Sequence, residues 1–342
     1  MIATEMPTSI LHSESHTNTA VALLERMRSG DVRALARAIS LVENETAAAP
    51  ALLSACFPYT GHALRIGLTG APGAGKSTLV DQLVLHYRAR QQSVGVVAVD
   101  PTSPYTGGAI LGDRIRMQRH HADPGLYIRS MATRGYLGGL ARATADVASV
   151  VEASGKDRLL IETVGVGQDE VDIVRLADVT VVVLVPGLGD DVQSLKAGVL
   201  EIADIFVVNK SDREGADRVE REVRAMQTLG AHAEGWVPPV LKTVASTGQG
   251  MEELAEMIEK CHQTLQQSGR LRDKRAAGWR ERLLDMVRQQ LMRELVEHRM
   301  GHAQLEAHAH AIAEGREDPY RLVETLLRGL LAQRAGKETW TT

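Results

Sequence analysis

The sequence is poor in aromatic residues, cysteines and long apolar runs, and each shortage argues against a class of protein. Aromatic residues make up only 3% of the 342 positions, which argues against a stacking platform for single-stranded nucleic acid. The two cysteines, Cys56 and Cys261, form no CxxC pair. This excludes a disulfide framework or a four-cysteine zinc site and fits a reducing compartment. No apolar run reaches the roughly 18 residues of a membrane span.

The sequence also lacks a strong excess of positive or negative charge. The formal net charge is −4, and no acidic or basic block dominates. The opening stretch MIATEMPTSILHSESHT contains no Lys or Arg, so it has the charge pattern of neither a signal peptide nor a transit peptide. We expect a frayed tail there and a cytoplasmic protein. The basic stretch 270–282 predicts a solvated helix face, with a nucleic-acid or anionic partner surface as the alternative.

Short apolar runs alternate with helix-like segments through the middle of the chain. One helix is predicted from Lys76 to Arg90. The predicted strands are 63–70, 93–100, 157–163, 178–186, 203–210 and 237–245. Continuous apolar runs suit strands that are covered on both faces. The sequence therefore predicts an α/β fold with a doubly wound, mostly parallel sheet.

Helical patterns flank this region on both sides. Residues 18–47 predict two short helices, with Asp31 as the N-cap of the second, and 47–61 predicts a connection with two prolines. Further helices are predicted at 251–266, 273–300, 302–314 and 318–334. Within them, Trp279, Leu283, Val287, Leu291 and Leu295 recur every four residues and form a stripe, which suits either a dimer surface or an internal core.

A phosphate-binding motif lies between the first strand and its helix. The segment GAPGAGKST fits GxxxxGK[ST] in the strand-to-helix context that the motif requires. Inward-facing backbone amides and the helix N-terminus favour phosphate oxygens. Lys76 is expected to reach the β and γ phosphates and Ser77 to ligate Mg²⁺. The predicted nucleotide-binding residues here are Gly70, Ala71, Pro72, Gly73, Ala74, Gly75, Lys76, Ser77 and Thr78.

A base-recognition motif follows a later strand. The segment NKSD, with Asn209, Lys210 and Asp212, fits the NKxD guanine signature. The Asp212 carboxylate can accept hydrogen bonds from guanine N1–H and its exocyclic amine, neither of which adenine offers there. Asn209 is expected to hold the loop and contact the base edge, while the Lys210 stem lies along the ring. Val244, Ala245 and Ser246 fall where backbone amides would support the base.

Carboxylates at two further strand ends are candidate metal ligands. Asp100 and Asp113 flank a glycine-rich loop, and Glu162 ends the next apolar run. All three are predicted catalytic residues together with Lys76, and predicted Mg²⁺ ligands together with Ser77. Glu162 would be an outer-shell ligand or a water positioner. The alternatives are a turn residue for Asp100 and a helix N-cap for Asp113.

The segment after Glu162 departs from many small GTPases. Gly165 would offer its amide to the γ-phosphate, but Val166 follows it where a water-orienting glutamine often stands. Gln168 lies two residues further on. We therefore expect slow intrinsic hydrolysis that a partner accelerates. Asp190, Asp191 and Lys196, in the loop 186–198, are candidate switch residues; a solvated loop is the alternative.

Taken in order, GAPGAGKST, DPTSPYTGGAILGD, ETVGVGQDE and NKSD closely resemble the MeaB family, also called ArgK, over about 55–330. These are P-loop GTPases of the SIMIBI class, the branch of the signal-recognition and MinD-like proteins. In this family, Glu before TxG is usual. The resemblance implies Mg²⁺-dependent GTP hydrolysis, a homodimer built through C-terminal helices, and binding to adenosylcobalamin-dependent methylmalonyl-CoA mutase, with GTP gating cofactor loading and protecting the mutase. It also implies that 186–198 is a switch that reports mutase binding.

This resemblance divides the chain into a helical N-terminal extension (1–55), a P-loop GTPase domain (56–267) and a C-terminal dimerisation arm (268–342). A metallochaperone for another metalloenzyme and a P-loop kinase are the alternatives. The first would need a Cys/His cluster, and His298, His302, His308 and His310 are better explained as solvent-facing. NKSD argues against an ATP-dependent kinase. The chain lacks the DxHxxG cobalamin signature, so the cofactor is expected on the partner.

Overall fold

The computed structural model describes residues 8–100, 123–132, 139–163, 175–187, 202–229 and 236–334. The chain divides into two compact units, 1–275 and 276–342. Within these described ranges, no helix is both long and apolar enough to cross a bilayer.

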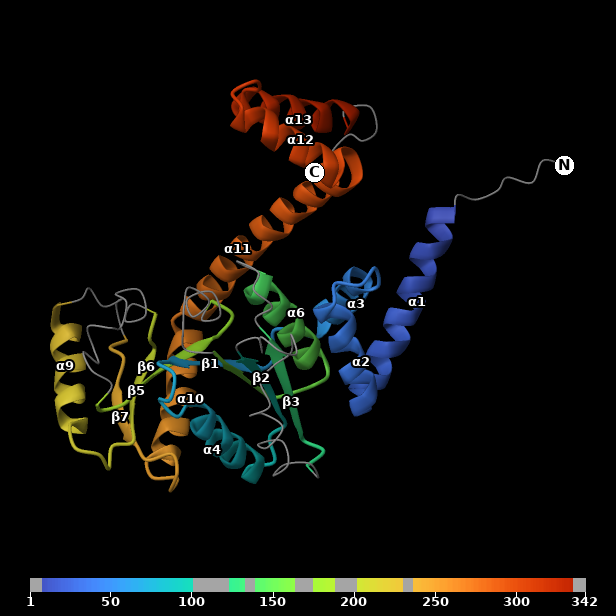
Figure 1. Cartoon of the computed structure of the whole chain (residues 1–342). Coiled ribbons are helices and arrows are strands. Elements are labelled where there is room, and N and C mark those ends of the chain that lie inside the picture. The colour runs from blue at the N-terminus through green and yellow to red at the C-terminus, as the bar shows by residue number, and fades with distance from the viewer. Residues whose placement is uncertain are drawn as a thin grey trace. The chain divides into compact units, whose positions relative to one another are not determined.

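The first unit is built on a parallel sheet, seen in Figure 1. Its seven strands lie in the order β3-β2-β4-β1-β5-β6-β7. Every neighbouring pair of these strands is parallel, which confirms the predicted sheet. The strands are β1 (Leu64–Gly70), β2 (Val94–Asp100), β3 (Leu126–Ala132), β4 (Arg158–Glu162), β5 (Val179–Leu184), β6 (Ile205–Asn209) and β7 (Val240–Thr243).

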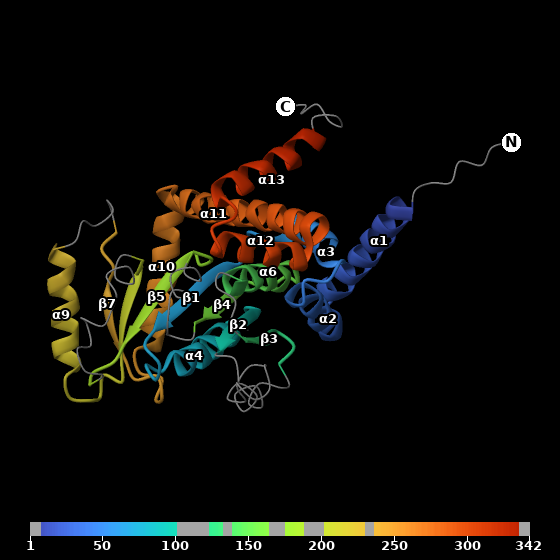
Figure 2. The same cartoon turned by 45° about the horizontal axis from the view of Figure 1, so that its top comes forward.

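Helices cover both faces of the sheet, as the continuous apolar runs predict. One face packs against α4 (Lys76–Ala89) and α10 (Met251–Gln267), whose apolar residues share a core with Ile66, Leu68 and Leu160. The other face packs against α6 (Gly139–Ala153) at one end and α9 (Ala216–Leu229) at the other. Figure 2 shows α6 and α4 on opposite sides of β2 and β4.

The N-terminal region is more helical than predicted. The expected tail is wrong from Thr8 onward, because α1 runs Thr8–Arg28. Once a helix has formed, each further residue that joins it adds one backbone hydrogen bond. The buried residues near the C-terminal end of α1 can therefore support its polar first half. The connection predicted at 47–61 is also wrong: it contains α3 (Ala49–Cys56) and a 3₁₀ turn (Phe57–Tyr59). Pro50 stands in the first turn of α3, where proline is tolerated.

The predicted helix break before Asp31 is confirmed. The Asp31 carboxylate accepts hydrogen bonds from the amides of Arg33 (2.9 Å) and Ala34 (3.0 Å) and caps α2 (Val32–Glu43). These N-terminal helices share a core with α6 and with Val97, Val99 and Ile161 of the sheet.

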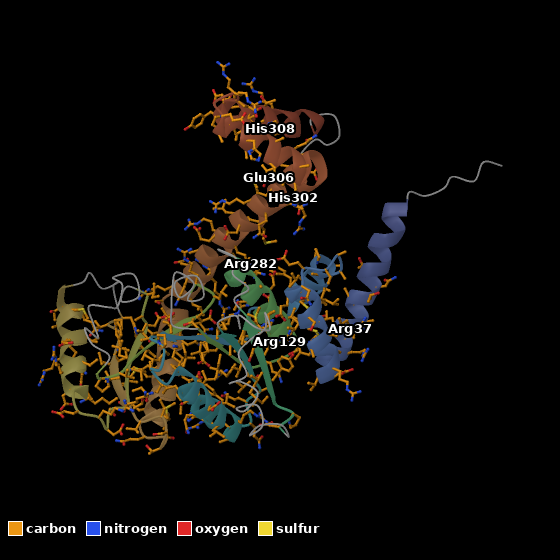
Figure 3. The ribbon with its side chains drawn as sticks, viewed as in Figure 1. Arg37, Arg129, Arg282, His302, Glu306 and His308 are labelled. Atoms are coloured by element: carbon orange, nitrogen blue, oxygen red, sulfur yellow. The ribbon has the colours of Figure 1, made fainter. Side chains whose placement is uncertain are left out.

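Besides α3, the sequence patterns missed strand β3 and helices α6 and α9. β3 lies at an edge of the sheet, and its sequence LYIRSMA mixes polar and apolar residues instead of forming a continuous apolar run. Arg129 of β3, labelled in Figure 3, pairs with Glu43 at the end of α2. The helices α6 and α9 have clear apolar faces but were not predicted.

The predicted C-terminal helices are confirmed as helices. They are α11 (Arg270–Met292), a π-helical stretch (Arg293–Met300), α12 (Gly301–Ala313) and α13 (Pro319–Arg334). Only Leu271 of α11 is buried. The stripe residues Trp279, Leu283, Val287 and Leu291 are exposed by 36–59%.

Ion pairs fix the first turn of α11 to the amino-terminal edge of the sheet. Arg275 donates from Nε (2.7 Å) and Nη2 (2.8 Å) to the carboxylate of Asp178, whose side chain is 2% exposed. Lys274 Nζ donates to Asp204 at 2.8 Å. A buried carboxylate without its partner is costly. A truncation near residue 268 would therefore damage the first unit, and the C-terminal helices are better tested by substitution.

Candidate functional site

The candidate site lies at the carboxyl ends of β1, β4 and β6. The loops that follow parallel strands meet at this edge, where open α/β sheets bind their ligands. β1 leads into the phosphate-binding motif, β4 ends in Glu162, and β6 ends in Asn209.

Two glycines of the phosphate-binding loop are required by close backbone approach. Gly70 has φ +141°, and a Cβ built on it would lie 2.1 Å from the carbonyl oxygen of Val183 on β5. Gly75 has φ +90°, and its Cβ would lie 2.4 Å from Nδ2 of Asn209. Side chains at either position would push the loop away from the sheet. The glycines therefore keep the loop pressed against β5 and β6.

Lys76 closes the loop on itself. It is the first residue of α4, only 6% exposed, and its Nζ donates to the carbonyl oxygens of Gly70 (2.7 Å) and Ala71 (3.1 Å). A buried ammonium needs such partners. The amine thus lies at the loop that would surround a phosphate group.

Ser77 and Glu162 meet across the site. Ser77 Oγ donates to Glu162 Oε1, and Glu162 is 8% exposed. Both present oxygen atoms, the ligand type that Mg²⁺ prefers. This part of the predicted metal site is therefore brought together by the fold.

Asn209 links the phosphate loop to the loop after β7. Its Nδ2 donates to the carbonyl of Ala74 at 2.8 Å, while its Oδ1 accepts from Thr243 Oγ1 and from the amide of Ala245, both at 3.1 Å. Asn209 is 2% exposed. These contacts connect the phosphate loop to β7 and the loop that follows it. The Thr243 contribution was missed, because sequence gives no sign of which hydroxyl faces Asn209.

Lys210 and Asp212 complete the NKSD segment. Lys210 has φ +55°, and its Nζ donates to the carbonyl of Gly73 at 2.7 Å. Asp212 is exposed in the loop after β6. The motif therefore joins two loops through Asn209 and Lys210 and leaves one carboxylate accessible.

The amides of 244–246 are not equivalent. Val244 N donates to the carbonyl of Gln249 (3.0 Å), and Ala245 N donates to Asn209 Oδ1. The structure thus corrects the expectation that all three amides face a base: two of them bond within the protein. The Ser246 amide has no such bond in the described part of the chain.

Several predicted site residues lie outside the described residues. Asp100 is the last residue of β2, but its side chain lies outside the described part of the structure. The others are Asp113, Gly165, Gln168, Asp190, Asp191 and Lys196.

The cysteines and C-terminal histidines offer little for a second chemistry. Burial raises the pKa of both Cys56 and Cys261 to about 12, which keeps the thiols protonated. Among the histidines, His308 Nδ1 lies 2.7 Å from Glu317 Oε2, while His302 is exposed on α12, where Figure 3 labels both histidines. The side chain of His298 lies outside the described residues.

Comparison with known proteins agrees with this geometry. Residues 35–300 match the family model described as "Methylmalonyl Co-A mutase-associated GTPase MeaB". A putative GTPase of Pyrococcus abyssi is 49% identical over 312 residues, covering 90% of this chain and 96% of the relative. GTPase ArgK of Escherichia coli is 35% identical, covering 82% and 86%. The mitochondrial methylmalonic aciduria type A homolog of Mus musculus is 34% identical, covering 77% and 65%.

A solved structure shares the fold. The crystal structure of an LAO/AO transport system kinase superposes with a TM-score of 0.68 at 26% identity, covering 92% of this chain and 98% of that one. The family model spans more than half of the chain, and both the phosphate loop and the NKSD loop lie within it. The chain belongs to the MeaB family of GTPases.

Proposed function

We propose that this chain is a GTPase chaperone that binds an adenosylcobalamin-dependent methylmalonyl-CoA mutase. It hydrolyses GTP to gate cofactor loading and to protect the mutase from inactivation. The observation that carries the nucleotide part is the joining of two loops: Asn209 and Lys210 of NKSD donate to Ala74 and Gly73 of the phosphate loop. The family's description supports the mutase part.

Phosphate binding would use Lys76 and the loop amides. The Lys76 amine, which donates to Gly70 and Ala71, would turn to the β and γ phosphates. Phosphoryl transfer to water needs little covalent help from the protein, so positioning and charge neutralisation dominate catalysis. The buried position of Lys76 strengthens its interaction with phosphate.

The metal site would be held by Ser77 and Glu162, joined by Asp100 and Asp113. Their oxygen atoms fit Mg²⁺, which supplies neutralisation of the phosphate charge when bound. The hydrogen bond from Ser77 to Glu162 supports the outer-shell interpretation, in which the carboxylate orients the hydroxyl ligand.

Guanine would be read by Asp212 and by the Ser246 amide. The accessible carboxylate can accept from N1–H and the exocyclic amine, and Ser246 N–H can donate to the guanine carbonyl. Because Val166 rather than glutamine follows Gly165, intrinsic hydrolysis is expected to be slow. Mutase binding, reported through Asp190, Asp191 and Lys196, would accelerate it.

Nucleotide-dependent capture of the mutase tests this function directly. We expect the immobilised chain to retain purified methylmalonyl-CoA mutase, with affinities that differ between GDP and a non-hydrolysable GTP analogue. Transfer of adenosylcobalamin to the captured apo-mutase, followed by absorbance, should require GTP hydrolysis. Ribosomes and an apo-metalloenzyme serve as competing partners. The proposal is contradicted if the chain captures no mutase, or if capture and cofactor loading are equal in every nucleotide state.

The exposed stripe on α11 is proposed as a homodimer surface. Leu283 is 59% exposed and Val287 is 49% exposed, so neither belongs to an internal core of the described chain. We expect Val287→Glu to convert the dimer to a monomer, because it places a carboxylate in a desolvated apolar contact. Light scattering over a concentration series measures the change.

A neighbouring substitution controls for added charge. Gln289→Glu introduces the same charge two residues along, about 200° around the helix, and is expected to leave the dimer intact. Thermal unfolding of the monomeric Val287→Glu chain should show an intact first unit. A monomeric parent chain, or a dimeric Val287→Glu variant, would show that the stripe has another use.

A further inference from the structure

Two buried threonines meet beside the site: Thr69 precedes the phosphate-binding motif, and Thr163 follows Glu162 in the segment ETVGVGQDE. Thr163 Oγ1 donates to Thr69 Oγ1 at 3.1 Å. Thr69 is 0% exposed and Thr163 is 2% exposed. Thr69 immediately precedes Gly70 of the phosphate loop, and Thr163 immediately follows Glu162. The bond therefore joins the second-to-last residue of β1 to the residue that directly follows β4.

The sheet register explains why the pair can control Glu162. Leu68 lies opposite Glu162, so Thr69 and Thr163 are the next pair in this parallel ladder. The amide of Thr163 donates to the carbonyl of Leu68 at 3.1 Å and extends the ladder by one rung. Side chains alternate between faces along a strand. Glu162 thus points to the α4 face, toward Ser77, while Thr163 points to the opposite face.

The two hydroxyls lie in a largely apolar part of the core. Ile161 of β4 and Val182 of β5, which is paired with Thr69, are apolar and fully buried, although Thr180 of β5 is another buried threonine. A buried hydroxyl costs free energy unless it is hydrogen-bonded, and valine has nearly the same shape. Thr163 donates and Thr69 accepts, so each hydroxyl has a partner, and their bond links the two strand ends.

From this geometry we infer that Thr69 and Thr163 are a positioning pair for Glu162. Their bond holds the backbone at 162–163 so that the Glu162 carboxylate meets Ser77, the proposed Mg²⁺ ligand. The inference rests on the proposed function, because it assigns the pair to the metal dependence of GTP hydrolysis. Neither threonine touches the nucleotide in this assignment.

A double-mutant cycle separates positioning from stability. In Thr163→Val, one hydroxyl is removed and the Thr69 hydroxyl is left buried and unpaired, so the variant should unfold at a lower temperature. In the double variant Thr69→Val with Thr163→Val, both hydroxyls are replaced by apolar groups of the same shape, and most of that stability should return. Thermal unfolding measures this half of the cycle.

The Mg²⁺ dependence of GTP hydrolysis is the second measurement of the double-mutant cycle. We expect both Thr163→Val and the double variant to raise the Mg²⁺ concentration for half-maximal GTP hydrolysis by about two- to tenfold, the range of one net hydrogen bond. Thr163→Ser keeps a hydroxyl and should restore the parent Mg²⁺ dependence. A purely structural pair would instead recover both stability and Mg²⁺ dependence in the double variant.

Thr180 is a matched control on the same sheet. It is also 0% exposed and lies on β5 beside β1, but its hydroxyl has no hydrogen-bond partner in the described part of the chain. Thr180→Val is expected to leave the Mg²⁺ dependence unchanged. An effect as large as that of Thr163→Val would overturn the inference, because loss of any buried hydroxyl would then suffice.

The outcomes also distinguish this inference from the proposed function. If the parent chain hydrolyses GTP with Mg²⁺ and the double variant has the parent Mg²⁺ dependence, the positioning role is wrong and the GTPase stands. If the parent chain neither binds GTP nor responds to Mg²⁺ in calorimetry, the proposed nucleotide chemistry fails, and the positioning role fails with it.

Discussion

Lys76→Ala is expected to abolish GTP hydrolysis, with a loss of at least about 10³-fold in kcat. The amine is the positive charge that the fold buries at the phosphate loop, where Lys76 is 6% exposed. Alanine leaves no cation to neutralise charge that develops on the transferred phosphoryl group. Single-turnover hydrolysis at saturating GTP, monitored by phosphate release, measures the loss.

The structure adds a second consequence of this substitution. Lys76 Nζ donates to the carbonyls of Gly70 and Ala71, so alanine also removes contacts that shape the loop. Nucleotide affinity should therefore fall as well, and calorimetry with GDP separates binding from chemistry. Persistent binding with lost hydrolysis would assign Lys76 mainly to the transition state.

Lys242→Ala is the matched control. Lys242 is an exposed lysine of β7 that forms surface ion pairs with Asp217 (2.6 Å) and Glu220 (2.7 Å). Such surface pairs contribute little to stability, so this variant should hydrolyse GTP at the parent rate. Hydrolysis by Lys76→Ala within tenfold of the parent chain would remove Lys76 from the catalytic machinery.

The elements that position the site were accessible from sequence because their signals are local. β5 and β6 are nearly continuous apolar runs, and β1 and β4 are almost as fully buried although each contains an arginine. The phosphate loop is a local motif whose glycines allow it to pack closely against β5 and β6. Such signals combine periodicity with turn chemistry over a few residues.

The contacts between loops were not accessible in the same way. Asn209 and Ala74 are 135 residues apart in sequence, and Thr163 and Thr69 are 94 apart. Their pairing depends on strand order and register, which a single sequence does not specify at that level of detail. The edge strand β3 was missed for a related reason: its sequence mixes polar and apolar residues, and its Arg129 is satisfied by Glu43 of a distant helix.

The base-reading residue makes the sharpest prediction about the substrate. Asp212→Asn is expected to weaken GTP binding by about 10²–10⁴-fold, because both charge-assisted hydrogen bonds to the guanine edge are lost or weakened. Xanthosine triphosphate should gain affinity. Its C2 carbonyl accepts from the new amide, while its N1–H still donates to the amide oxygen. Competition calorimetry with GTP, XTP and ATP measures the exchange of preference.

Asp217→Asn provides the matched control for this exchange. Asp217 is an exposed carboxylate five residues further along, and its pKa is held low by a hydrogen bond from Lys242 rather than by any loop of the site. Its substitution removes the same charge without touching the base loop, so GTP preference should persist. Because Asn209 and Lys210 hold the loops while Asp212 remains exposed, Asp212→Asn should change specificity without unfolding the site. Unchanged GTP affinity in that variant would exclude Asp212 as the base reader.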